Sequence, residues 1–288
     1  MKIIIPNPKN LEQLKKQIKK QGYQNLHILS DFDRTLTYGS VDGVKTPSII
    51  SMLRDGNHLT EGYAEKAHAL FDKYHPIEID QNINLDEKKK LMKEWWEKHN
   101  KLLIESNLSK SDLEDIVVNG NVKFRKGITE FLDYIHKNNI PLVILSASGC
   151  GDAIKMFFQE AKKDYPNIYY VTNQFNWNKK GRAISSREPI IHSMNKDETV
   201  LKQIPEIYKI VKDRRNVLLL GDSISDLGMI KGFDYETLIK IGFLNFDYNK
   251  SIKDYRENFD VVLEGDGDFG YVNELIRDLR DKKQINYK

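Results

Sequence analysis

Short apolar runs that lead directly into small or acidic residues constrain the fold of this 288-residue chain most strongly. Three runs share this form: Leu26–Leu29 before Ser30-Asp31, Leu142–Leu145 before Ser146, and Val217–Leu220 before Gly221-Asp222. Runs of this length, closed by turn-forming residues, predict buried strands. Amphipathic helical patterns lie between them, so we expect an α/β fold with a parallel sheet.

The rest of the expected sheet follows the same rhythm. Two further strands are predicted at residues 240–244 and 261–263, and helices are predicted at residues 10–22, 128–135, 154–161 and 201–211. Pro205 must either kink the last of these helices or mark its start. Because ligands bind beyond the carboxyl ends of parallel strands, the polar residues that follow the runs should share one site.

Residues 41–121 do not alternate strands with helices. They predict helices at residues 61–74 and 85–106, and a third helix opened by a capping box of Ser111 and Glu114. The stretch is far longer than an ordinary connection between a strand and its helix. We therefore expect a catalytic core of residues 1–40 and 122–288, with residues 41–121 inserted as a helical module over the active edge of the sheet.

Four aspartates follow two of the predicted strands. Asp31 and Asp33 stand two positions apart, and Asp222 and Asp226 stand four positions apart at an expected helix start. Alone, the Asp-x-Asp-x-Thr pattern is unspecific, and two solvated acids in a turn would explain it equally well. Carboxylates gathered at one edge repel one another, and a hard divalent cation offsets that repulsion. Mg²⁺ is the expected metal, because it binds through few carboxylates and keeps positions open for water and phosphate.

The same edge carries groups that bind anions. Ser146, with the backbone amides of Ala147 and Ser148, is placed to hold an anion at a third strand end. Lys196 adds a positive charge. An acidic metal site, a hydroxyl, backbone donors and one lysine together indicate phosphoryl transfer.

These motifs, in this order, resemble those of the haloacid dehalogenase (HAD) superfamily of phosphatases. The matching set is Asp31-x-Asp33-x-Thr35, Ser146, Lys196 and Gly221-Asp222-x-x-x-Asp226. More closely, the chain resembles the cytosolic 5′-nucleotidase III (pyrimidine 5′-nucleotidase) family from about Asp31 to its last helix. That likeness also includes the segments Pro76–Asp80, Glu94–Trp96, Ile191–Lys196 and Lys240–Asn245.

The resemblance implies a Rossmann-like parallel core with an inserted α-helical cap of the C1 type. It implies that Asp31 is the nucleophile and forms an aspartyl-phosphate. Asp33 would protonate the nucleoside 5′-oxygen and then deprotonate the attacking water. The residues implied to hold the phosphate are Ser146, Ala147 and Lys196. The residues implied to hold Mg²⁺ are Asp31, Asp222, Asp33 through its backbone carbonyl, and Asp226 adjacent to the metal or behind it.

In this family the cap closes over the site and supplies the nucleobase pocket. The candidate base contacts are Glu94, Trp95, Trp96 and His99. A carboxylate can hydrogen-bond the edge of a base, and an indole can stack on its face. Adjacent residues point to different faces of a helix, so one of the two tryptophans is expected to pack in the cap's own core.

Two departures from the family pattern concern segments around the site. The loop Ser146–Asp152 is one residue longer than usual, and His99 stands one position before the family's histidine. The longer loop bears on how the backbone surrounds the phosphate. The shifted histidine bears on base selectivity more than on catalysis.

Composition narrows the choice of partners. The chain has 45 Lys and Arg against 42 Asp and Glu, and this balance of +3 neither demands nor excludes nucleic acid. Its apolar runs are too short for a membrane span or a signal peptide, and its single cysteine, Cys150, excludes an internal disulfide framework. We expect a cytoplasmic protein, a monomer or weak dimer, whose partner is a small nucleoside monophosphate rather than a nucleic acid polymer.

The expected function is a Mg²⁺-dependent phosphatase for nucleoside 5′-monophosphates, with UMP- or CMP-like substrates. Three alternatives stay open: a phosphatase for another small ester such as phosphoserine, phosphoryl transfer to a nucleoside, and a nucleotide-binding protein without catalysis. The last is disfavoured, because binding alone does not need a second carboxylate for acid–base work. The sequence does not distinguish UMP, CMP and 7-methylguanosine monophosphate.

Overall fold

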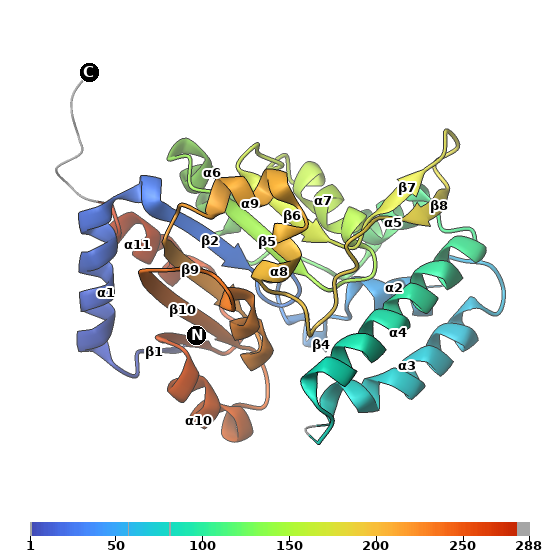
Figure 1. Cartoon of the computed structure of the whole chain (residues 1–288), viewed down its shortest axis with the longest axis horizontal. Coiled ribbons are helices and arrows are strands. Elements are labelled where there is room, and N and C mark those ends of the chain that lie inside the picture. The colour runs from blue at the N-terminus through green and yellow to red at the C-terminus, as the bar shows by residue number, and fades with distance from the viewer. Residues whose placement is uncertain (1, 57, 81, 281–288) are drawn as a thin grey trace.

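A seven-stranded sheet forms the centre of the molecule (Figure 1). The structure is a computed structural model and describes residues 2–56, 58–80 and 82–280, so the expected core residues 281–288 lie outside the described residues. The strand order is β1-β11-β10-β9-β2-β5-β6. All neighbouring pairs are parallel except β1 and β11, which pair antiparallel. The predicted α/β class with a mostly parallel sheet is confirmed.

The five predicted strands are all present. They are β2 (Leu26–Ser30), β5 (Leu142–Ser146), β9 (Asn216–Gly221), β10 (Thr237–Leu244) and β11 (Val261–Glu264). The two edge strands, β1 (Lys2–Ile4) and β6 (Ile168–Thr172), were not predicted. Every residue of β2, β5 and β9 is buried, because helices cover both faces of the sheet there.

Helices pack on both faces of the sheet, and alternate residues of each strand pack against the helices of one face or the other. On one side lie α1 (Pro8–Gln21), α6 (Ile128–Lys137), α7 (Gly151–Glu160) and α11 (Gly270–Asp278). On the other lie α8 (Glu198–Lys202), α9 (Pro205–Val211) and α10 (Tyr248–Asn258). Ile28 belongs to the first core and Leu29 to the second, as the two-residue period of a strand requires. Pro205 begins α9 as its first residue and does not kink a longer helix.

A run of helices, which we call the helical insert (residues 49–119), lies in the sequence between β2 and β5, which are neighbours in the sheet. Its members are α2 (Ile49–Asp55), α3 (Tyr63–Ile79), α4 (Leu85–Glu105) and α5 (Lys110–Asn119), preceded by the hairpin of β3 (Ser40–Val41) and β4 (Val44–Lys45). Figure 1 shows α3 and α4 side by side at one end of the molecule. None of the helices in the described part of the chain is long and apolar enough to cross a membrane.

The start of α5 differs from the prediction by two residues. Its capping box is formed by Ser109 and Asp112, with the Ser109 amide donating to Asp112 Oδ2 over 2.8 Å. The predicted box of Ser111 and Glu114 is wrong, because the Asp112 carboxylate already caps the helix at Ser109, two residues earlier.

A hairpin from the core contacts the insert at the start of α5. Strands β7 (Phe175–Trp177) and β8 (Ala183–Ser186) form this hairpin. The Ala183 amide donates to the Leu108 carbonyl over 2.9 Å, and the Lys110 amide donates to the Gly181 carbonyl over 2.9 Å. The insert is thus joined to the core by backbone hydrogen bonds as well as through its two connecting segments.

Candidate active site

Three adjacent strands deliver polar residues to one edge of the sheet. Asp31 follows β2, Ser146 ends β5, and Asp222 follows β9. The Asp31 amide donates to the Leu220 carbonyl over 3.1 Å, which holds the first residue beyond β2 against the end of β9. The shared site predicted from the strand ends therefore exists as a structural cluster.

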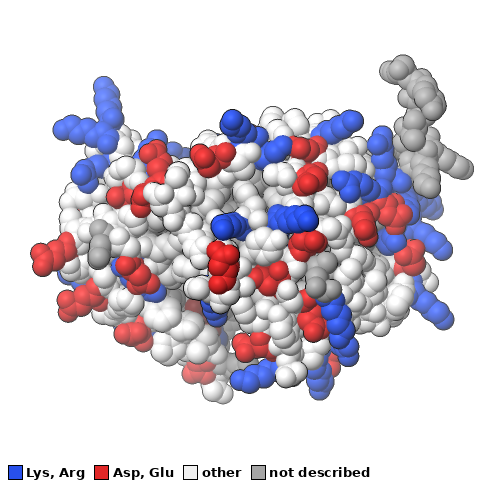
Figure 2. All heavy atoms as spheres, turned by 180° about the vertical axis from the view of Figure 1, so that it is seen from behind, with Lys and Arg blue, Asp and Glu red and all other residues white. Residues whose placement is uncertain are grey.

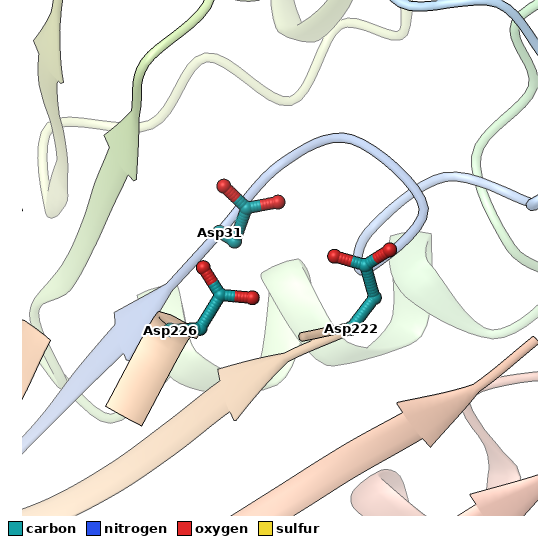
Figure 3. A group of neighbouring side chains, drawn as sticks. All are labelled: Asp31, Asp222 and Asp226. Atoms are coloured by element: carbon teal, nitrogen blue, oxygen red, sulfur yellow. The ribbon is translucent and has the colours of Figure 1, made fainter. Parts of the chain in front are cut away.

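Three carboxylates converge at this edge. One oxygen from each of Asp31, Asp222 and Asp226 lies within 4.8 Å of the others, and the three side chains point toward a common space (Figure 3). Burial raises the pKa of Asp222 well above its ordinary value, and the like charges of Asp226 and Asp31 raise it further. An all-oxygen donor set with mutual repulsion fits a hard divalent cation. The side chain of Asp33 is not part of this cluster.

Asp226 is held in place by two donors. It lies in the 3₁₀ helix η2 (Ile224–Ile230), where its Oδ2 accepts the Ser223 amide over 3.0 Å as part of a capping box. Its Oδ1 accepts Lys196 Nζ over 2.9 Å. Because both oxygens already accept hydrogen bonds, Asp31 and Asp222 are better placed to bind a cation directly.

Lys196 reaches the cluster from the segment between β8 and α8. Its Nζ donates to Asp31 Oδ1 over 2.6 Å as well as to Asp226, and the side chain is 9% exposed. Burial alone would lower the pKa of Lys196, but attraction to Asp226 and Asp31 outweighs it and raises the pKa. The lysine is therefore charged and can neutralise an anion bound beside Asp31.

Asp33 occupies a different environment from Asp31. It is half-buried, and burial raises its pKa to about 6, against the opposing attraction of Arg34 and Lys196. A carboxyl group with a pKa near 6 carries a proton part of the time near neutral pH. Such a group can give a proton to a leaving oxygen and take one back from water.

A cavity of about 250 Å³ opens above these groups. It is lined by residues from both the core and the helical insert: Asp31, Asp33, Ser48, Ile50, Glu78, Trp95, Trp96, Ser146, Ala147, Ser148, Ser193, Lys196 and Ser225. The predicted phosphate ligands Ser146, Ala147 and Lys196 all lie in its wall. The Ser148 amide donates to Ser146 Oγ over 3.1 Å. This amide therefore supports the serine, contrary to the expectation that it would help to bind an anion.

Both tryptophans line the cavity, but Trp95 is more deeply buried than Trp96. Trp95 is buried and stacks on Tyr74 with ring centroids 5.8 Å apart. Trp96 is half-buried, and its ring is 5.8 Å from that of Trp95 at an interplanar angle of 14°. Gly149 lies against Trp96, since a Cβ at Gly149 would stand 2.4 Å from an indole ring carbon. Trp95 thus packs in the insert's small core, and Trp96 offers the more available ring.

Glu94 and His99 do not line the cavity. Glu94 accepts hydrogen bonds from Tyr74 and Lys98, and the Lys98 bond lowers its pKa to about 2. Glu94 and Trp96 are two positions apart on the helix, a rotation of about 200°, so their side chains face nearly opposite ways. His99 is buried behind Trp96, where Tyr63 Oη lies 3.1 Å from its Nε2 and burial lowers its pKa to about 4.

Glu78 is the carboxylate that the insert brings to the cavity, and it was not predicted as a site residue. Its Oε1 accepts a hydrogen bond from Ser193 Oγ, and its side chain is 25% exposed. The sequence signal was an acid between Ile77 and Ile79, but the predicted helix ended at residue 74. The observed α3 continues through Pro76 to Ile79 and thereby carries Glu78 to the site.

Comparisons with known proteins agree with this geometry. Residues 34–280 match a family model described as pyrimidine 5′-nucleotidase (UMPH-1). The chain is 35% identical over 274 residues to a 7-methylguanosine phosphate-specific 5′-nucleotidase of Gallus gallus, covering 95% of this chain and 94% of the relative. The Homo sapiens protein of the same name is 32% identical over 278 residues, covering 96% and 92%.

Solved structures also match this chain. A crystal structure of cytosolic 5′-nucleotidase IIIB bound to cytidine matches with a TM-score of 0.84 and 28% identity, covering 96% of this chain and 92% of that one. A HAD family hydrolase from Salmonella enterica matches with a TM-score of 0.53 and 15% identity, covering 88% and 72%. The second likeness concerns the fold alone.

Proposed function

Because this chain belongs to the pyrimidine 5′-nucleotidase (UMPH-1) family and is thus a phosphoric monoester hydrolase with a HAD fold, we propose that it is a Mg²⁺-dependent phosphatase of nucleoside 5′-monophosphates. One observation carries the proposal. A single cavity has phosphoryl-transfer groups on its core wall and a carboxylate with two indoles on its insert wall. A nucleoside monophosphate has the matching halves, a phosphate and a flat base.

We assign the first chemical step to Asp31. Its carboxylate attacks phosphorus, the bond to the nucleoside oxygen breaks, and an aspartyl-phosphate forms. Lys196, 2.6 Å from Asp31, offsets the repulsion between the two anions and stabilises the transferring group. Asp33 gives its proton to the departing 5′-oxygen, which leaves as a hydroxyl.

The second step releases phosphate. Asp33, now ionised, takes a proton from water, and that water attacks phosphorus and restores the Asp31 carboxylate. Ser146 and the amide of Ala147 hold the phosphoryl oxygens throughout. Mg²⁺ held by Asp31, Asp222 and the Asp33 carbonyl, with Asp226 behind them, would neutralise charge on those oxygens. The three converging carboxylates support this metal assignment.

We further propose that residues 41–121 act as a cap that supplies the base pocket. Trp96 would stack on the base and Glu78 would accept hydrogen bonds from its edge, with Trp95 and His99 supporting Trp96 from behind. A carboxylate favours an edge that carries an amino group, so CMP should bind better than UMP. The 7-methylguanosine phosphate specificity in the names of the relatives favours 7-methyl-GMP as a second candidate, since its cationic base also suits stacking on tryptophan.

The test is phosphate release from CMP, UMP, GMP, 7-methyl-GMP and phosphoserine, each with Mg²⁺ and with EDTA. We expect Mg²⁺-dependent release from at least one nucleotide, with CMP or 7-methyl-GMP first. Faster release from phosphoserine than from every nucleotide would refute the nucleotidase proposal. Adding a nucleoside acceptor and analysing the products separates hydrolysis from phosphoryl transfer.

Two matched glutamates test the base pocket. Glu78→Gln should change the order of preference among the nucleotides, because an amide presents a donor where the carboxylate only accepts. Glu94→Gln, on the same insert but engaged by Lys98 and Tyr74, should leave that order unchanged. If only Glu94→Gln changed the order, the base pocket would lie elsewhere.

We also propose that the protein works in the cytoplasm as a monomer or weak dimer and does not bind nucleic acid polymers. On the face seen in Figure 2, basic and acidic side chains are interspersed, which gives a polyanion little to follow on that side. The word cytosolic in the name of the solved relative supports the location.

A further inference from the structure

Arg125 is among the largest fully buried side chains in the described part of the chain, at 1% exposed. It lies between α5 and α6, outside the cavity, and was not singled out in the sequence. Its guanidinium donates to five oxygens: the carbonyls of Thr35, Arg34 and Gly267 and the side chains of Asn245 and Asp266. The guanidinium also lies 4.7 Å from the centre of the Phe243 ring.

Two of these acceptors follow Asp33 directly. Arg125 Nη2 donates to the Arg34 carbonyl over 2.6 Å, and Nε donates to the Thr35 carbonyl over 2.9 Å. Arg34 has φ of 59°, a left-handed conformation that is strained for a non-glycine residue. Asn245 Nδ2 donates to the same Arg34 carbonyl over 2.9 Å. The strained turn beyond Asp33 is therefore fixed by two buried donors.

The same group ties this turn to the segments that enter and leave the helical insert. Asp266, paired with Arg125 at 3.1 Å, accepts the amides of Gly39 and Ser40 over 2.7 Å each. The Arg125 amide donates to the Leu36 carbonyl over 3.0 Å, so the outgoing and returning segments are joined here. Arg125 thus lies where the turn beyond Asp33 meets the two segments that connect the helical insert to the core.

We propose that Arg125, assisted by Asn245 and Asp266, is a positioning residue that sets the backbone of Asp33 and Arg34, and so the direction in which Asp33 delivers its proton. The inference rests on the acid–base role proposed for Asp33. A planar guanidinium with five donors in a fixed fork can serve all these acceptors, whereas a lysine ammonium cannot. Displacing a catalytic group by about 1 Å can slow a reaction about 100-fold.

The test compares Arg125→Lys with Arg214→Lys. Arg214 also donates to two backbone carbonyls, those of Tyr23 and Leu26, over 3.2 and 3.0 Å, but at the opposite end of β2. Both variants should lose stability, as urea unfolding measures. Only Arg125→Lys should slow phosphoenzyme formation from a nucleotide, about 10- to 100-fold at saturation, with KM nearly unchanged.

The leaving group supplies a readout that lost stability does not affect. The leaving group of 4-nitrophenyl phosphate departs without a proton. At saturating Mg²⁺, which offsets weaker metal binding by the Asp33 carbonyl, Arg125→Lys should therefore slow phosphoenzyme formation from it far less than from a nucleotide. Equal slowing with both substrates, or no more slowing than Arg214→Lys shows, would overturn the proposal. If Arg125→Lys does not fold, Asn245→Ala removes one of the two donors to the Arg34 carbonyl and is held to the same criterion. If wild-type protein cleaves phosphoserine but no nucleotide, the substrate proposal fails and the same comparison is made with phosphoserine.

Discussion

Replacing Gly149 by alanine should weaken nucleotide binding through Trp96. The added Cβ would stand 2.4 Å from one ring carbon of Trp96 and 3.0 Å from another, with Ile50 at 3.2 Å on a further side. An extra methyl group in a packed site costs about 1–3 kcal/mol, and the indole must move to relieve the clash. Stacking of a base on an aromatic ring is worth about 1–3 kcal/mol. Losing it should raise KM for CMP about 5- to 150-fold.

The assay compares CMP with ribose 5-phosphate, which has the phosphate and sugar but no base. Gly149→Ala should lower kcat/KM strongly for CMP and by no more than about twofold for ribose 5-phosphate. Gly228→Ala is the matched control, because a Cβ at Gly228, also near the site, meets open space. Equal losses with both substrates would show that the alanine acts on the Ser146 loop. An unchanged KM for CMP would refute Trp96 as the base contact.

Three further predictions concern stability. Mg²⁺ at about 100 times its Kd should stabilise the protein by about 2.7 kcal/mol, and a thermal shift that survives in Asp222→Asn would contradict the metal assignment. Lys196→Met should destabilise the metal-free protein by about 3 kcal/mol at pH 8, because two buried carboxylates lose their partner. Burial raises the pKa of Asp31 to about 7, so urea unfolding should show a smaller loss at pH 5.5, where Asp31 binds a proton. Burial lowers the pKa of His27 to about 4. Between pH 6.5 and 4 the histidine therefore binds a proton in the unfolded chain but not in the folded one, so stability is lost as the pH falls through this range. Between pH 7 and 5 the loss from this group is about 2 kcal/mol, and His27→Gln should show a correspondingly shallower fall in urea midpoint.

The catalytic edge could be predicted because its signals are local. Each strand is a short apolar run, and the functional residue follows within two positions, as Asp31 follows Leu29 and Asp222 follows Leu220. Parallel strands bring such ends together whatever the remainder of the chain does. The pattern therefore predicted, without any knowledge of long-range contacts, that Asp31, Asp33, Asp222 and Asp226 gather at one edge. The side chains of Asp31, Asp222 and Asp226 converge there, and that of Asp33 does not join them.

The residues of the helical insert that line the cavity could not be predicted in the same way. Glu78 was missed because the predicted helix ended at residue 74, whereas α3 continues through Pro76 to Ile79. Glu94 was preferred because it adjoins two tryptophans in sequence, yet helical rotation turns it away. Arg125 has partners near residues 34, 245 and 266, so only the folded chain shows what it holds.

Rapid acid quenching of the protein mixed with Mg²⁺ and radiolabelled CMP, or 7-methyl-GMP if that is the better substrate, tests most directly whether Asp31 attacks the phosphate. We predict a base-labile phosphoprotein that forms within the first turnover and decays as phosphate is released. Its label should map to Asp31, and Asp31→Asn should trap none. Label on another residue, or full-rate phosphate release by Asp31→Asn, would contradict the mechanism.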